Sequence, residues 1–356
     1  MKILIADIGA GRTKIVTRGN VRGKERWIEY VQPSYAHALT ADEWNAVTAR
    51  NLQSSGYALI NGAPFAFGYT ARQYTTVRPE GVARYKRDYL GAVMAYGAVM
   101  VNATGALSLV VMHPPNALLW RDHMLDAVSG DWSVTTFTAG GRSKKHHVSV
   151  QKVNYLDEPL GGLNNVMITD AGKLDATIGR VQSVMTVDVG AHTTDVAVIL
   201  ERQLRAESLR SVQVGVNGLL DSARDWLRSS HLPLMTVLGN PDIDDARLFS
   251  AFQDGYITLG AHHIDLRPFL TPALMRLTND VNDVMRGSDY SLANMLVITG
   301  GGGALLESTL RQAHRPVFQN AIMLAETPDY MQFANARGAY KLASALTKYK
   351  PRGNHA

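Results

Sequence analysis

Residues 186–196 read TVDVGAHTTDV, an apolar run that breaks in the middle and then resumes. The break is at Gly190 and Ala191, and an acid lies on each side of it, Asp188 and Asp195. A glycine between two short runs of β-branched residues is typical of a tight turn that joins paired strands. The stretch therefore predicts a β-hairpin whose first strand ends near Asp188.

The same pattern occurs a second time, at the N-terminus. Residues 7–16 read DIGAGRTKIV and residues 188–197 read DVGAHTTDVA, and both have the form Asp, β-branched residue, Gly, Ala, two variable residues, Thr, charged residue, β-branched residue. A repeated hairpin indicates a duplicated structural unit. With strands leading repeatedly into helices, the sequence predicts an α/β protein. We expect one lobe at 1–180 and a second at 181–334, with a C-terminal helix in 335–356 packing back on the first.

Composition excludes several classes of protein. The chain has 356 residues, of which 46% are hydrophobic, and it has no cysteine, which excludes disulfide frameworks and thiolate-bound metals. The N-terminus becomes acidic at Asp7, too early for a signal peptide, so we expect a cytoplasmic protein. Basic residues gather at 141–147 and 348–355, where they could attract an anionic surface or nucleic acid. No signature of a sequence-specific nucleic-acid-binding domain accompanies them.

Residues 90–112 have no charge over a length that could span a bilayer. Asn102, Thr104 and Gly105 interrupt the run, which favours a buried helix near 88–101 followed by a strand at 107–112. We therefore expect no membrane span.

The two hairpins suit a polyphosphate with a bound cation. Glycines in a turn let backbone N–H groups approach phosphate oxygens closely, and Gly9, Gly11 and Gly190 are placed for this. Lys14 could add a positive charge. Asp7 and Asp188 would repel each other across such a ligand, and a magnesium ion would relieve that repulsion.

A third glycine-rich turn follows a different strand. Residues 295–313, MLVITGGGGALLESTLRQA, predict a strand, a turn at Gly300 to Gly303 and a helix. Bare backbone at the start of a helix favours an anion or a flat ring. The ending of a Walker A loop and the dinucleotide fingerprint are both absent. No GxSxG elbow marks a serine hydrolase, and the adjacent histidines at 146–147 and 262–263 would point to opposite faces of a strand, so zinc is not expected.

The order of these motifs resembles the phosphate 1, phosphate 2 and adenosine motifs of the actin superfamily. The matching segments are 7–14, 188–196 and 299–303. Within the superfamily the chain looks like the prokaryotic ParM-like plasmid-segregation and archaeal actin-like group. The resemblance implies an actin-like ATPase fold, in which two similar lobes each have a mixed central sheet flanked by helices and a nucleotide cleft lies between them.

The resemblance also implies roles for the matching residues. Asp7 and Asp188 would hold magnesium, and they form the catalytic set together with Glu158, which would orient the attacking water. The residues implied to bind ATP or ADP are Gly9, Ala10, Gly11, Arg12, Thr13 and Lys14 in the first turn, Gly190, Ala191, His192, Thr193 and Thr194 in the second, Gly218, and Gly300, Gly301, Gly302 and Gly303 in the third. Arg12 and His192 depart from the usual pattern, and either could slow hydrolysis or alter nucleotide sensing.

As a function, the resemblance implies an ATPase that polymerises with itself and moves or positions DNA or another cargo, with a DNA-bound adaptor protein as a possible partner. The alternative is a non-polymerising small-molecule kinase of the same superfold, although no acceptor signature is apparent. A chaperone-like use of the fold requires a substrate-binding appendage after the ATPase, which we do not expect for a chain of this length. The sequence leaves the choice between ATP and GTP open.

Overall fold

The chain divides into two compact units. The computed structural model describes residues 1–9, 11–75, 86–138, 142–176, 178–201, 203–239, 241, 243–288, 290–319 and 321–348. Unit 1 comprises residues 1–178 and 333–356, and unit 2 comprises residues 179–332. Each unit has its own central sheet and its own hydrophobic core.

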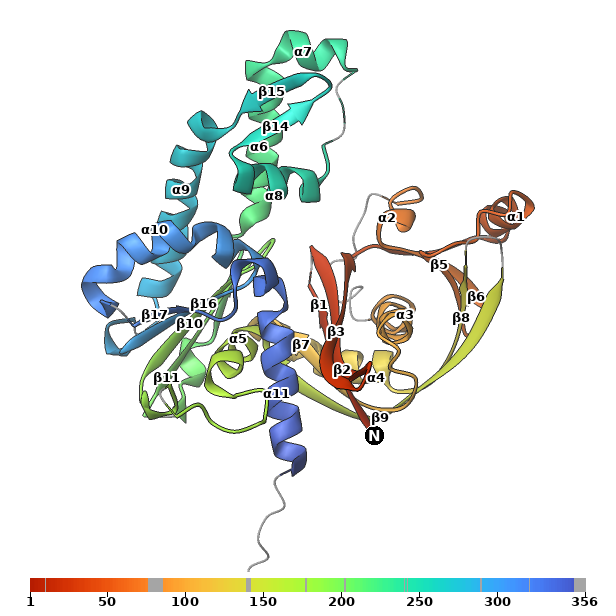
Figure 1. The fold of residues 1–356 in the computed structure, drawn as a ribbon, viewed down its shortest axis with the longest axis horizontal. Helices are drawn as coiled ribbons and strands as arrows, with labels where there is room; N and C mark the ends of the chain where they lie inside the picture. The colour runs from red at the N-terminus through yellow and green to blue at the C-terminus, as the bar shows by residue number, and fades with distance from the viewer. Residues whose placement is uncertain are drawn as a thin grey trace, which may run out of the picture. The chain divides into compact units, whose positions relative to one another are not determined.

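Unit 1 is built on a nine-stranded sheet (Figure 1). Its strands are β1 (Lys2–Ile8), β2 (Arg12–Val21), β3 (Lys24–Pro33), β4 (Ala36–Ala38), β5 (Tyr57–Ile60), β6 (Ala63–Phe67), β7 (Gly105–His113), β8 (Gly130–Phe137) and β9 (Ser143–Asp157). Its helices are α1 (Ala41–Ala49), α2 (Gly68–Ala71), a π-helix (Arg87–Gly91), α3 (Ala92–Met100), a 3-10 helix (Pro115–Trp120), α4 (Arg121–Val128), α5 (Glu158–Met167) and α11 (Ala334–Lys348). The strand order is β3-β2-β1-β7-β9-β8-β5-β6-β4.

Helix α3 explains the long uncharged stretch of the sequence. The sheet curves around it, so that α3 packs against β2, β5, β8 and β9 (Figure 1). Residues 92–99 are all buried. A helix that is apolar on every side must be enclosed by protein or lipid, and here strands enclose it. Among the described residues, no helix is long and apolar enough to cross a membrane.

The other face of the same sheet is covered by α5 and α11, which lie side by side (Figure 1). Ala336 and Ala339 of α11 pack on Ile5 and Val16 of the first hairpin. The bidentate ion pair between Arg337 and Glu29 adds bonds of 2.7 and 3.0 Å. The helix that ends the described chain is therefore part of the core of unit 1.

Unit 2 is built on a smaller sheet and a helical layer. Its strands are β10 (Val184–Val189), β11 (Thr194–Leu200), β12 (Gln203–Leu204), β13 (Arg210–Val212), β14 (Tyr256–Leu259), β15 (His262–Asp265), β16 (Met295–Thr299) and β17 (Ile322–Leu324). Its α-helices are α6 (Val216–Ser230), α7 (Leu232–Val237), α8 (Asp245–Asp254), α9 (Arg267–Arg286) and α10 (Gly301–Phe318). The 3-10 helices are Ile178–Arg180, Ala206–Ser208, Tyr290–Leu292 and Pro328–Phe333, the first and last of which lie at the unit boundaries.

Helices cover one face of this sheet. Alternate residues of β10 and β11, such as Met185, Val187 and Val196, contribute to a core that also contains residues of α6, α9 and α10. The β14–β15 hairpin lies with α7 and α8 at the end of the unit away from β10 and β16 (Figure 1). The core thus supports β10, which ends directly before Gly190, and β16, which ends directly before Gly300.

Five strands at the centre of each sheet have the same order and the same directions. In unit 1, β3, β2 and β1 are antiparallel neighbours, and β7 and β9 follow in parallel. In unit 2, β12, β11 and β10 are antiparallel neighbours, and β16 and β17 follow in parallel. The repeated motif begins at the same point of both cores, near the end of the first strand of the hairpin. The duplication that the sequence predicts is therefore present in the fold.

The elements differ from the prediction in three places. The apolar and aromatic residues of 64–74, PFAFGYTARQY, predict a strand, but the strand ends at Phe67 and a short helix follows, where Gly68 adopts a φ of +58°. The apolar helix begins with a π-helical turn at 87–91. Strand β8, GDWSVTTF, was not predicted, although residues 131–135 alternate between polar and apolar.

Candidate functional site

The first turn places a buried carboxylate beside an ammonium group. β1 and β2 pair with Asp7 opposite Lys14, and Lys14 Nζ lies 2.9 Å from Asp7 Oδ2. Asp7 is 1% exposed, and its second oxygen, Oδ1, is buried without a hydrogen-bond partner among the described residues. A buried anionic oxygen without a donor is costly unless a cation or an ordered water reaches it. Asp7 therefore fits a magnesium ion or its water shell.

Ser34 holds Gly9 and Gly11 on either side of the first turn, and no sequence motif marks this serine. Its hydroxyl donates to the Gly9 carbonyl at 2.5 Å, and its N–H donates to the Gly11 carbonyl at 3.1 Å. The Thr13 hydroxyl lies 3.1 Å from the same Ser34 oxygen. Thr13 and Ser34 are both buried, so they position the turn from behind. Arg12 begins β2 and is half-buried, whereas Ala10 lies outside the described residues.

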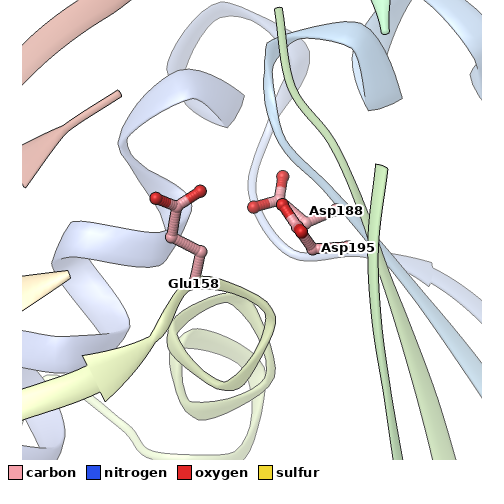
Figure 2. A group of neighbouring side chains, drawn as sticks. All are labelled: Glu158, Asp188 and Asp195. Atoms are coloured by element: carbon pink, nitrogen blue, oxygen red, sulfur yellow. The ribbon is translucent and has the colours of Figure 1, made fainter. Parts of the chain in front are cut away.

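The second turn carries two carboxylates where the first carries a carboxylate and an amine. β10 and β11 pair with Asp188 opposite Asp195, the register of Asp7 and Lys14 in unit 1. Carboxylate oxygens of Asp188 and Asp195 lie within 4.8 Å of each other, and both residues are buried (Figure 2). Two like charges this close favour a bound cation or a proton. Unit 2 therefore offers the stronger cation site of the two turns.

Asp195 was not among the predicted site residues, although the repeat contains the signal. It occupies the position of Lys14 in the first copy and thus faces the magnesium candidate Asp188. The Thr193 hydroxyl donates to Asp195 Oδ2 at 3.0 Å, which holds this carboxylate in place. The Thr194 hydroxyl donates to the Val214 carbonyl at 2.7 Å and so anchors the turn from the side of the core.

The second turn is tied to the start of α6. The N–H of Val216 donates to the Gly190 carbonyl at 3.2 Å, and the N–H of Asn217 donates to the Ala191 carbonyl at 2.8 Å. The Asn217 amide nitrogen lies 2.8 Å from His192 Nε2. His192 thus links the second turn to the first turn of α6. Gly218 lies one residue further along α6, and a Cβ there would meet no atom within 4 Å.

The glycine-rich turn adjoins the second turn within unit 2. Asp188 and Thr299 are register partners, so the segments that follow β10 and β16 leave the sheet side by side. Gly300 has a φ of +81°, and a Cβ there would collide with the Asp188 carboxylate. A Cβ on Gly302 would lie 2.7 Å from the Val189 side chain, and one on Gly303 would lie 2.9 Å from that of Ile298. These three glycines are explained by close packing.

Gly301 is different, because a Cβ there would meet nothing within 4 Å. Glycine at the start of a helix costs up to about 1 kcal/mol relative to alanine, so bare backbone without a packing reason suggests a ligand surface. We expect Gly301→Ala to leave thermal stability unchanged or slightly raised, and to weaken binding of an ATP analogue by about tenfold, as one misplaced methyl group does in a fitted pocket. Calorimetric titration checks this.

The neighbouring Gly302→Ala is the matched control for this prediction. It adds the same methyl group one residue away, against Val189. It should lower the melting temperature instead. Equal affinity of wild type and Gly301→Ala would remove Gly301 from the nucleotide site.

Glu158 begins α5 in unit 1 and projects from its first turn (Figure 2). Pro159 follows at a position where the missing N–H costs nothing, which fixes the helix start directly after β9. The preceding Asp157 pairs in register with His113, whose Nδ1 lies 3.5 Å from Asp157 Oδ1. Burial raises the pKa of Asp157, and the neighbouring His113 partly opposes this. The His113–Asp157 pair thus links the ends of β7 and β9, directly before Glu158.

Each unit thus assembles its own share of the predicted residues. Unit 2 brings together Asp188, the turn at 190–194, the start of α6 near Gly218 and the turn at 300–303. Unit 1 brings together Asp7, Gly9, Gly11 and the start of β2, and Glu158 begins α5 of the same unit. Both shares combine at least one buried carboxylate with a turn rich in glycine, which is a chemistry suited to magnesium and phosphate.

Comparison with solved structures shows which class of fold this is. An archaeal actin homolog, Ta0583, superposes with a TM-score of 0.71 over 97% of this chain and 100% of its own, at 17% sequence identity. The ParM protein of Bacillus thuringiensis with AMPPNP gives a TM-score of 0.71 over 98% and 99%, at 13% identity. The chain has an actin-like fold. The predicted fold class is confirmed, and so is the resemblance in fold to ParM-like and archaeal actin-like proteins.

Two further structures bear on this actin-like fold. Ta0583 has also been solved in complex with ADP, and this form gives a TM-score of 0.67 at 16% identity over 97% of this chain and 99% of its own. A non-polymerisable quadruple mutant of pCBH ParM gives a TM-score of 0.65 at 16% identity, over 96% and 99%. No protein-family model matches the sequence, and neither does any curated protein.

Proposed function

We propose that this actin-like chain binds and hydrolyses ATP with magnesium and assembles with itself into nucleotide-dependent filaments. The observation that carries the proposal is the duplicated hairpin, which ends in a buried aspartate and a glycine turn in both units. An actin-like fold with one such turn in each unit suits a nucleotide held by both. The ADP and AMPPNP complexes of the similar structures support a nucleotide ligand.

The proposed roles follow from the local geometry. Asp188, with Asp195 beside it, holds the metal, and Asp7 with its open Oδ1 contributes to its shell. The bound magnesium would neutralise phosphate charge. N–H groups of both glycine turns and the Lys14 ammonium bind the phosphates, and Gly301 and Gly218 leave bare backbone for the nucleoside.

Glu158 is the proposed group that orients the attacking water. A carboxylate can accept a hydrogen bond from that water and hold it for attack. Projection of Glu158 from the first turn of a helix fixed by Pro159 gives it a defined place. Arg12 and His192 are proposed to contact phosphate at the ends of the two turns, and the Arg12 guanidinium would add a positive charge there.

Self-assembly is the finer part of the proposal. It is supported by the actin-like fold and by the similarity to a ParM whose quadruple mutant is called non-polymerisable. Filaments that form with ATP and fall apart after hydrolysis could move or position DNA through a DNA-bound adaptor protein. Such a cycle would take place in the cytoplasm, where ATP is available.

Sedimentation and electron microscopy test assembly directly. The protein is incubated over a broad concentration range with ATP, ADP or a slowly hydrolysed ATP analogue, each with magnesium or with a chelator. We expect filaments and a pelleted fraction with the analogue and magnesium, transient filaments with ATP, and little assembly with ADP. Absence of any nucleotide-dependent pelleting would remove the filament. ATP turnover that requires an added metabolite would instead indicate a kinase.

A further inference from the structure

Charge is divided unevenly between the two units. Unit 1 contains 24 Lys and Arg against 14 Asp and Glu, a net formal charge of +10. Unit 2 contains 12 against 17, a net charge of −5. An asymmetry of this size between two halves of a chain is a signal for a polyanionic partner of the basic half.

Part of the excess positive charge lies at the start of β9. Arg142, Lys144 and Lys145 are exposed and form no ion pair among the described residues. Parallel pairing with β7 begins only at Val148, so residues 143–147 have β8 on one side and no described strand on the other. Burial and the charge of Lys144 together lower the pKa of His146. The start of β9 is therefore a positively charged strand edge.

Hydroxyl groups of β8 lie beside these cations. Lys145 pairs in register with Thr135, and Lys144 pairs with Thr136. Adjacent residues of a strand point to opposite faces, so Lys145 with Thr135 and Lys144 with Thr136 flank the strand edge from opposite faces of the sheet. The Thr136 hydroxyl also lies 3.2 Å from His146 Nε2. Lysine, arginine, serine and threonine side chains, with free backbone N–H groups, are the usual contacts of nucleic-acid phosphates.

The acidic unit of a second copy fits this strand edge less well. At least four of the 17 acids of unit 2 are already paired with arginines of the same unit three or four residues away. Examples are Asp221 with Arg224, Asp225 with Arg228, Asp283 with Arg286 and Glu307 with Arg311. The phosphates of a nucleic-acid backbone are regularly spaced and neutralised only by mobile counterions, which bound lysines and arginines can displace.

We propose that the start of β9, with Arg142, Lys144 and Lys145 and the threonines of β8, binds the phosphodiester backbone of nucleic acid without regard to sequence. Such a surface would let the chain contact DNA directly, in addition to any adaptor. It does not depend on ATP hydrolysis or on filament formation.

Fluorescence anisotropy with a labelled DNA duplex of random sequence, measured over a series of salt concentrations, tests the site. The double variant Lys144→Gln/Lys145→Gln removes two exposed charges. The control Arg228→Gln/Arg267→Gln removes two exposed charges from unit 2, where each has an acidic partner, so both proteins have the same net charge. We expect the slope of log K against log salt to fall by about 2 for the first variant, one for each lost phosphate contact. The control should keep the wild-type slope.

Three results would overturn the proposal. Equal losses in both double variants would mean that net charge alone attracts DNA. Unchanged DNA binding with impaired nucleotide-dependent pelleting would assign the surface to a second copy. Unchanged DNA binding with increased aggregation would mean that the lysines only protect an exposed strand edge from pairing.

Discussion

Asp188→Asn is expected to lower magnesium-dependent ATP turnover by about 10³-fold, which corresponds to about 4 kcal/mol of transition-state stabilisation. The reason is the pair of buried carboxylates on β10 and β11, whose charges make unit 2 the stronger cation site. Asparagine keeps the shape of the side chain but removes the charge that holds the metal. Steady-state turnover at saturating ATP and magnesium measures the effect.

The same variant should fold at least as well as the wild type. Removing one of two like charges within 4.8 Å relieves a repulsion, so the melting temperature without nucleotide should hold or rise. Asp225→Asn is the matched control, because Asp225 is an exposed carboxylate of α6 whose partner is Arg228. It should leave turnover unchanged. Wild-type turnover in Asp188→Asn would refute the metal assignment.

Gly338→Ala is expected to lower the free energy of unfolding by about 3 kcal/mol, the upper end of the usual cost of overpacking a core. Gly338 is buried on α11 where that helix crosses α5. A Cβ there would collide with the Gly161 carbonyl and would lie 2.5 Å from the Asn165 nitrogen. Neither backbone atom can move without shifting α5. Chemical or thermal unfolding followed by circular dichroism measures the loss.

Gly218→Ala is the control for this substitution. It makes the same change inside a helix, but at a position where the new methyl group meets no atom within 4 Å. Alanine then adds only its higher helix propensity, up to about 1 kcal/mol. The two variants should therefore shift the melting temperature in opposite directions. A stable Gly338→Ala would contradict close packing of the C-terminal helix on unit 1.

The duplicated architecture could be predicted from the sequence because its signal is local. The two copies of the hairpin motif carry the same spacing of Asp, Gly and Thr, and the structure places both as the central hairpins of matching sheets. The buried helix α3 could likewise be predicted from an uncharged run interrupted by polar residues. The predicted boundary at 180/181 depends on contacts throughout the chain, and the compact units divide at 178/179.

The supporting residues could not be predicted, because their partners are distant in sequence. Ser34 reaches back 25 residues to hold the Gly9 carbonyl, and nothing near position 34 marks it. The His192–Asn217 contact likewise spans 25 residues. Asp195 could have been predicted as a site residue, because an alignment of the two copies places it at the position of Lys14. The assignment of individual residues to magnesium, phosphate and water stays a prediction.

A crystal structure with magnesium and a slowly hydrolysed ATP analogue tests the central claim most directly. We expect the phosphates to contact backbone N–H groups of both the turn after β1 and the turn after β10, with the metal near Asp188 and Asp195. The base should lie against the bare backbone at Gly301. A nucleotide bound elsewhere, with both turns free of ligand, would contradict the account.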